Sequence, residues 1–125
     1  MGKVEIFWSC TGQFYYDLAK NALARMAYGL SIELKQDCIA VLAVSPGFMR
    51  TELVLKHLGV NEENWQEAED LSQTETPHYL GRGITALASD PNVMEKSGQV
   101  LKVGDLAKEY QFTDIDGRYI PPFSI

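Results

Sequence analysis

Tyr16 and Lys20 are the residues of this chain whose types and spacing best suit chemistry. They stand near the start of an amphipathic run over 14–36, so a helix would place both side chains on one face, one turn apart. A free tyrosine titrates at about pH 10, and an ammonium group at ~4–5 Å favours loss of a phenolic proton by about 3–4 kcal/mol at an effective dielectric of ~20. The pair therefore predicts a proton-transfer tyrosine, with an ordinary surface pair as the alternative.

The composition bounds the class of protein. The chain has 125 residues, of which 46% are apolar and 22% charged, and its formal net charge is -6. This length predicts a single domain over 1–125 with one core. The acidic balance argues against nucleic acid or an anionic membrane as the main partner, because both need a basic face. No apolar stretch reaches the length of a membrane span, so none is expected.

The two cysteines indicate neither a metal site nor a redox site. Cys10 and Cys38 are far apart and fit no ligand spacing. We expect two buried or half-buried thiols in a reducing compartment, and hence a cytoplasmic protein, with a disulfide between them as the alternative. His57 and His78 show no spacing to carboxylates or thiols that suggests a metal, so no metal is expected.

The first half of the chain predicts an α/β layered fold. Residues 3–8 alternate loosely, as a strand does. Apolar residues recurring at spacings of three and four predict a long helix over about 15–35. The β-branched run 38–44 predicts a strand buried on both faces, as in a parallel sheet, and Ser45-Pro46-Gly47 ends it. A helix followed by such a strand is typical of a layered α/β protein.

Shorter elements are predicted in the second half. A short helix fits 52–57. The acidic stretch 61–70 around Trp65 fits a solvated surface helix, with a mobile flap in which Trp65 reaches a site as the alternative.

Thr76-Pro77 suits the cap and first residue of a helix that reaches about Ser89. A short strand is expected within 97–104. A last helix follows over 106–110, capped by Asp105, and then an extended tail.

Two motifs lie in register along these elements. Tyr16-Asp17-Leu18-Ala19-Lys20 resembles the YxxxK motif of the short-chain dehydrogenases/reductases. Pro46-Gly47-Phe48-Met49-Arg50-Thr51 resembles that family's PGxxxT element. The stretches 81–92, 97–101, 105–107 and 114–118 are similar to its dehydrogenase/reductase family member 1-like subgroup. The resemblance covers about 13–120, and the chain looks like the C-terminal half of a family member.

The resemblance implies a fold and a cofactor. The fold would be the C-terminal half of a Rossmann-like doubly wound sheet, and the cofactor NAD or NADP. Tyr16 would exchange a proton with a small-molecule carbonyl or alcohol substrate, while Lys20 assists it; both would also contact the cofactor. Pro46 and Gly47 would bring backbone close to the nicotinamide, and Thr51 would bond its carboxamide or a phosphate.

The segment of about 52–76 would cover the substrate, with Trp65 as a lid residue. The N-terminal pattern of the family is not matched. No Gly-rich strand-to-helix turn occurs in 1–125, and Gly81-Arg82-Gly83 falls inside a predicted helix. The family's catalytic Ser is expected about thirteen residues before Tyr16, where this chain has Lys3.

These departures leave two hypotheses. The chain is part of an NAD(P)-dependent oxidoreductase and is inactive alone, or it is a truncated, non-catalytic α/β module. Half of a Rossmann-like sheet has an open edge and an uncovered apolar face, so such a module would form a homo-oligomer or complete its sheet with a complementing N-terminal half.

Overall fold

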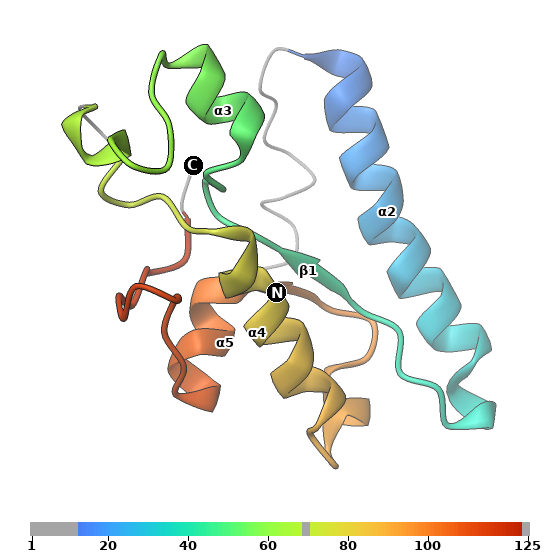
Figure 1. Ribbon diagram of the computed structural model, residues 1–125. Coiled ribbons are helices and arrows are strands. Elements are labelled where there is room, and N and C mark those ends of the chain that lie inside the picture. Colours follow the sequence, from blue (N-terminus) through green and yellow to red (C-terminus); the bar gives the residue numbers. More distant parts are fainter. Residues whose placement is uncertain (1–12, 69–70, 124–125) are drawn as a thin grey trace. The chain divides into compact units, whose positions relative to one another are not determined.

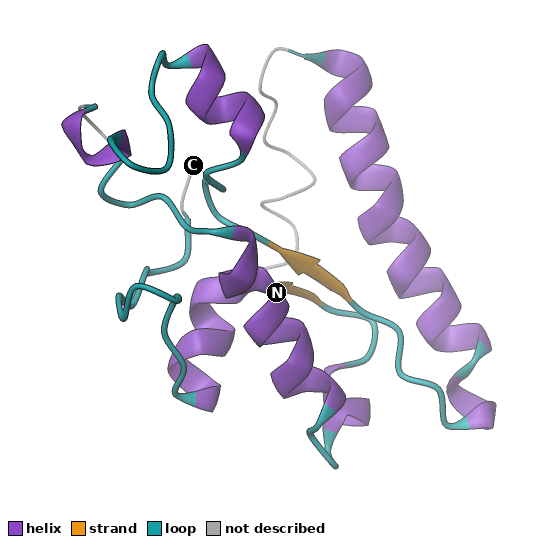
Figure 2. Ribbon diagram, viewed as in Figure 1, coloured by secondary structure: helices purple, strands orange, loops and turns teal. Residues whose placement is uncertain are grey.

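The computed structural model describes residues 13–68 and 71–123 (Figure 1). The elements in chain order are α2 (Phe14–Glu33), η1 (Lys35–Asp37), β1 (Ala43–Ser45), α3 (Glu52–His57), η2 (Trp65–Glu67), α4 (Pro77–Ala88), η3 (Val93–Lys96), β2 (Val100–Lys102) and α5 (Val103–Tyr110). In this described part the chain is a mixed α/β protein in which β1 and β2 form a parallel sheet (Figure 2). The strand expected within 3–8 lies outside the described residues.

The chain divides into two compact units, and each is described by itself. The first unit contains α2, η1, η3 and the greater part of both strands. The second contains α3, η2, α4 and α5, together with the segments between α3 and α4 and the tail after α5. The single domain expected from the length stays a prediction.

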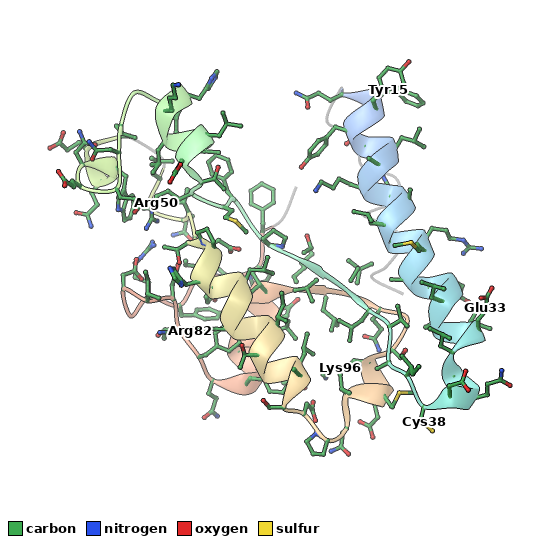
Figure 3. All side chains as sticks on the ribbon, turned by 45° about the vertical axis from the view of Figure 1, so that its right-hand side comes forward. Tyr15, Glu33, Cys38, Arg50, Arg82 and Lys96 are labelled. Atoms are coloured by element: carbon green, nitrogen blue, oxygen red, sulfur yellow. The ribbon has the colours of Figure 1, made fainter. Side chains whose placement is uncertain are left out.

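Helix α2 confirms the long helix expected from the apolar spacing. Tyr15 and Glu33 lie at its two ends (Figure 3). Its buried residues are all small: Ala24, Ala27 and Ser31. They recur at spacings of three and four and so share one face. Gly98 packs against this face, since a Cβ there would lie only 2.6 Å from Ser31 Oγ.

Strand β1 is shorter than the strand expected over 38–44. Cys38 has φ 55, so the backbone turns there before it extends. The backbone groups of Val41 are hydrogen-bonded although Val41 lies outside the strand. Its N–H donates to Ser97 Oγ at 2.9 Å, and its carbonyl accepts from the Gly98 N–H at 2.6 Å. The residues of β1 are half-buried. Cys38 itself is a free, exposed thiol, so the expectation that it is at least half-buried is wrong.

The core of the second unit forms where α4 packs beside α5 (Figure 1). Tyr79 is fully buried, and its hydroxyl donates to Ile120 O at 2.8 Å and accepts from Ile120 N–H at 3.2 Å. Around Tyr79 lie Val103, Ala107, Ile120, Leu80 and Phe112. Pro77 begins α4, as expected. Helix α5 starts at Val103 with no side-chain cap, so the cap predicted at Asp105 is wrong.

A smaller core cluster lies under the segment that follows α3. It consists of Leu55, Trp65 and Leu71. The surface helix predicted over 61–70 is wrong for 61–68, where the only helical element is the short η2. Asn61 Oδ1 accepts from the backbone N–H groups of Glu63 and Asn64. Such bonds offer the backbone an alternative to the helix ladder, so they favour turns.

Gly104 lets the C-terminal tail lie directly on α5. A Cβ at this position would stand 2.3 Å from Pro122 N. We therefore expect Gly104→Ala to lower the free energy of unfolding by about 1–3 kcal/mol or more, because the backbone has to move. Urea unfolding followed by circular dichroism measures the change.

The matched control is Gly81→Ala, an exposed site on α4 where a Cβ meets nothing within 4 Å. This change should stabilise by up to about 1 kcal/mol, since alanine is the better helix former. Equal effects of the two substitutions would contradict the packing of the tail on α5.

Candidate functional site

The Tyr16–Lys20 pair lies on one face of α2. Lys20 Nζ is 5.4 Å from the centre of the Tyr16 ring, within the range of a cation–π contact. Both side chains are exposed, Tyr16 by 54%. Ala24 and Ala27 continue the same helix face toward the C-terminus and are buried. The pair thus lies at the exposed, N-terminal end of the helix face that Ala24 and Ala27 bury. An accessible phenol beside an ammonium group suits proton exchange with a small molecule.

The turn from Pro46 to Thr51 follows β1 and is fixed by the segment around Glu75. The Gly47 N–H donates to Glu75 Oε1 at 3.0 Å. The Glu75 N–H donates to Phe48 O at 3.0 Å, and the Arg50 N–H donates to Glu75 O at 2.7 Å. Met49 and Glu75 also form a parallel β-bridge. The element with the cofactor-binding pattern is therefore held from one side along most of its length.

Thr51 ends this turn and begins α3. Its Oγ1 accepts the Val54 N–H at 3.3 Å, which makes it the N-cap of the helix. A hydroxyl that accepts through its oxygen still has its proton to donate. Thr51 can therefore cap α3 and bond an acceptor such as a carboxamide oxygen or a phosphate at the same time.

Two buried carboxyl groups connect distant parts of the second unit. Glu75 and Asp114 are each 1% exposed. Asp114 accepts from the N–H and the hydroxyl of Thr76, and from the Ile115 N–H. Burial raises the pKa of Glu75; the Gly47 N–H opposes this, and the charge of Asp114 adds to it. The sequence analysis missed both residues, because neither stands in a periodic pattern that marks a buried position: Glu75 lies between two threonines, and Asp114 between Thr113 and Ile115.

Arg50 is a further buried charged residue that the sequence analysis did not single out. Arg50, labelled in Figure 3, is 4% exposed, and its guanidinium lies 3.9 Å from the centre of the Trp65 ring. Its Nη1 donates to Thr74 Oγ1 at 3.3 Å, and its Nε pairs with Glu62 at 3.5 Å. Trp65 is thus packed into the core of the unit, and its role as a lid residue stays a prediction.

Arg118 approaches the same indole from the tail, 5.2 Å from its centre. It donates to the carbonyls of Ser72 and Thr74 at 2.6 and 2.9 Å. Burial acts to raise the pKa of Asp116, but the hydrogen bonds and charge of Arg118 outweigh it and hold that pKa below its usual range. Arg118 therefore connects the tail to the segment before α4.

The expected site residues fall into two groups. Tyr16 and Lys20 come together in the first unit, whereas Pro46, Gly47 and Thr51 come together in the second. Within 13–68 and 71–123 no cluster of three or more histidine, cysteine or acidic side chains suits a metal. In the same ranges no helix has the length and apolar character needed to cross a membrane.

Comparison with known proteins finds no matching family model. The chain is distantly similar to dehydrogenase/reductase SDR family member 1. It is 33% identical over 114 residues to the protein of Mus musculus and 32% identical over 114 residues to that of Homo sapiens. Each match covers 86% of this chain and 36% of the relative. The chain therefore spans little more than a third of the relatives' length. The resemblance inferred from the motifs is confirmed as a distant similarity.

The stability contributed by the Arg50–Trp65 contact should depend on the planar shape of the guanidinium group. Arg50→Lys keeps the charge but loses the planar guanidinium that covers the indole, so we expect a loss of about 1–2 kcal/mol in the free energy of unfolding. Urea unfolding followed by tryptophan fluorescence measures it.

Arg25→Lys is the matched control, because Arg25 is exposed and its guanidinium lies 5.2 Å from the centre of the Tyr28 ring. Its effect should stay within about 0.5 kcal/mol, as for most surface changes. If both substitutions change the free energy of unfolding equally, the buried Arg50–Trp65 contact has no special role in stability.

Proposed function

We propose that this chain belongs to the short-chain dehydrogenases/reductases and forms part of an NAD(P)-dependent oxidoreductase. The enzyme would interconvert a hydroxyl and a carbonyl group on a small-molecule substrate. The observation that carries the proposal is the accessible Tyr16–Lys20 pair, with Lys20 Nζ 5.4 Å from the Tyr16 ring centre. The distant similarity to dehydrogenase/reductase SDR family member 1 supports the same chemistry.

Tyr16 would be the acid and base of the reaction. Its hydroxyl gives a proton to the substrate oxygen when the carbonyl is reduced and takes one when the alcohol is oxidised. Lys20, one turn away, places a positive charge beside the phenol. The bound nicotinamide cofactor supplies or accepts the hydride. The sequence does not distinguish NAD from NADP, so the proposal covers both.

The Pro46–Thr51 turn would hold the nicotinamide end of the cofactor. Its residues fit that task, since Thr51 retains a hydroxyl proton after capping α3 and the turn is braced by Glu75. Pro46 and Gly47 would bring backbone close to the nicotinamide. The segment over 52–76 would cover the substrate.

Removing the phenolic oxygen of Tyr16 tests the chemistry. In the whole polypeptide that contains this chain, we expect Tyr16→Phe to lower kcat by about 10²–10⁴-fold, because the group that exchanges the proton is lost. The measurement is NADH or NADPH absorbance with a panel of carbonyl substrates.

Tyr15→Phe is the control, since Tyr15 is the neighbouring tyrosine and is 83% exposed. It should leave kcat unchanged. A Tyr16→Phe protein that retains full activity would exclude Tyr16 as the acid and base.

A second candidate is a non-catalytic module that associates through α2. This helix exposes large apolar side chains along its length, among them Phe14 by 66%, Leu18 by 55%, Met26 by 54% and Ile32 by 60%. Leu18 and Met26 are separated by two helical turns and so share one face. An exposed apolar surface of this kind favours a homo-oligomer or a complementing N-terminal half.

Light scattering tests the second candidate. If α2 is the contact, the chain should form a dimer or larger species at micromolar concentration, and Leu18→Glu with Met26→Glu should reduce it to a monomer. Ile84→Glu is the control, since Ile84 is an exposed apolar residue of α4 (51%). A stable monomer of the unaltered chain would exclude self-association through α2.

A further inference from the structure

Glu75 contacts the Pro46–Thr51 turn through both its backbone and its side chain. Its backbone bonds Phe48 and Arg50, and its side chain bonds the Gly47 N–H. The residue is 1% exposed, so this carboxyl group is enclosed by protein. A buried carboxyl is costly unless it is hydrogen-bonded, which marks the bond to Gly47 as a specific feature.

The second carboxyl oxygen lies close to Gly47, on the side where a side chain would begin. A Cβ on Gly47 would lie 2.9 Å from Glu75 Oε2 and 3.5 Å from the Cβ of Phe123. One oxygen of Glu75 thus accepts the Gly47 N–H while the other occupies the space that a side chain would fill. The carboxyl group encloses the turn on this side, so a ligand reaches Gly47 from the opposite side.

We propose that Glu75 is a positioning residue that holds the Pro46–Thr51 turn in the conformation that receives the nicotinamide. This inference rests on the proposed function. Glu75 acts through Gly47 and needs no contact with cofactor or substrate. A turn that is already fixed loses less conformational freedom on binding, and therefore binds more tightly.

The ionised carboxylate is the form that holds the turn best. An ionised acceptor makes a stronger bond to an amide than a neutral one. The titratable groups that face Glu75 are Asp114 from the tail and Tyr79 from α4. Burial raises the pKa of Glu75 above 4.5, with the Asp114 charge acting in the same direction.

The sign of the effect on stability follows from this shift. A raised pKa in the folded state means that Glu75 contributes stability below pH 4.5, which is lost as the pH rises through the folded value. At neutral pH the charge therefore strengthens the bond to Gly47 while it destabilises the fold. A residue kept at a cost to stability is typical of functional sites.

Three substitutions distinguish the effects of the charge of Glu75, the length of its side chain and its hydrogen bond to Gly47. Glu75→Gln keeps the acceptor oxygen and removes the charge; Glu75→Asp keeps the charge but is one methylene too short; Glu75→Ala removes both. The readouts are the Gly47 amide resonance and its hydrogen exchange in the ¹⁵N-labelled chain. KM for NADH and NADPH, and kcat, are measured in the whole polypeptide that contains this chain.

In the unaltered protein, the Gly47 amide should titrate with a midpoint above 4.5. We expect Glu75→Asp and Glu75→Ala to speed its exchange and raise KM for the cofactor by about tenfold or more, with kcat at saturation unchanged. Glu75→Gln should abolish the titration of the Gly47 amide and leave KM for the cofactor close to that of the unaltered protein. This variant should also be more stable than the unaltered protein at pH 7, but not at pH 4. Glu95→Gln, an exposed carboxylate of η3, is the control and should change none of these.

The outcomes keep the two proposals apart. If no variant changes the Gly47 amide, or if the amide changes while KM does not, Glu75 is not a positioning residue. If the unaltered polypeptide binds neither nucleotide, the proposed function fails, and the role toward the cofactor fails with it. The Gly47 amide then still reports whether Glu75 holds the turn. If Glu75→Ala does not fold, Glu75→Gln and Glu75→Asp decide the question.

Discussion

The second unit depends on hydrogen bonds that two buried carboxyl groups accept from the backbone of distant segments. Glu75 holds the turn that follows β1, and Asp114 holds Thr76 just before α4. Because Glu75 and Thr76 are adjacent, the two sets of bonds meet at one point of the chain. The turn after β1, the start of α4 and the tail are thus fixed relative to one another, although they are far apart in sequence. The backbone donors offset part of the cost of burying these carboxyl groups.

Cation–aromatic packing completes this unit where apolar contacts are few. Arg50 and Arg118 both lie against the indole of Trp65, and both also bond Thr74, through its hydroxyl and its carbonyl respectively. The segment after α3 therefore carries its own small core instead of lying loosely on the surface. This makes the residues around Trp65 a structural part of the unit, whatever the segment covers.

Helix α2 has two different kinds of surface, a buried face of small residues and exposed sides with large apolar residues. Its buried face consists of small residues, which allow Gly98 to approach closely, and the same face ends in the accessible Tyr16 and Lys20. Its other sides expose large apolar groups. The chemistry proposed for the pair and the association proposed for the apolar side chains therefore use different faces of α2.

The sequence by itself determined the elements whose signals are local. Apolar periodicity predicted α2, Pro77 predicted the start of α4, and the Pro-Gly turn and the Tyr16–Lys20 spacing predicted the candidate site residues and a distant resemblance that the comparisons confirm. Tertiary structure alone decided the burial of Glu75, Asp114 and Arg50, the packing of Trp65, and the shortening of the strand expected over 38–44. These features depend on contacts between residues 15 to 56 positions apart, such as Arg50 with Trp65 and Val41 with Ser97. No periodicity within a short window encodes such contacts, because a polar residue has the same local pattern whether its partner is water or a distant backbone group.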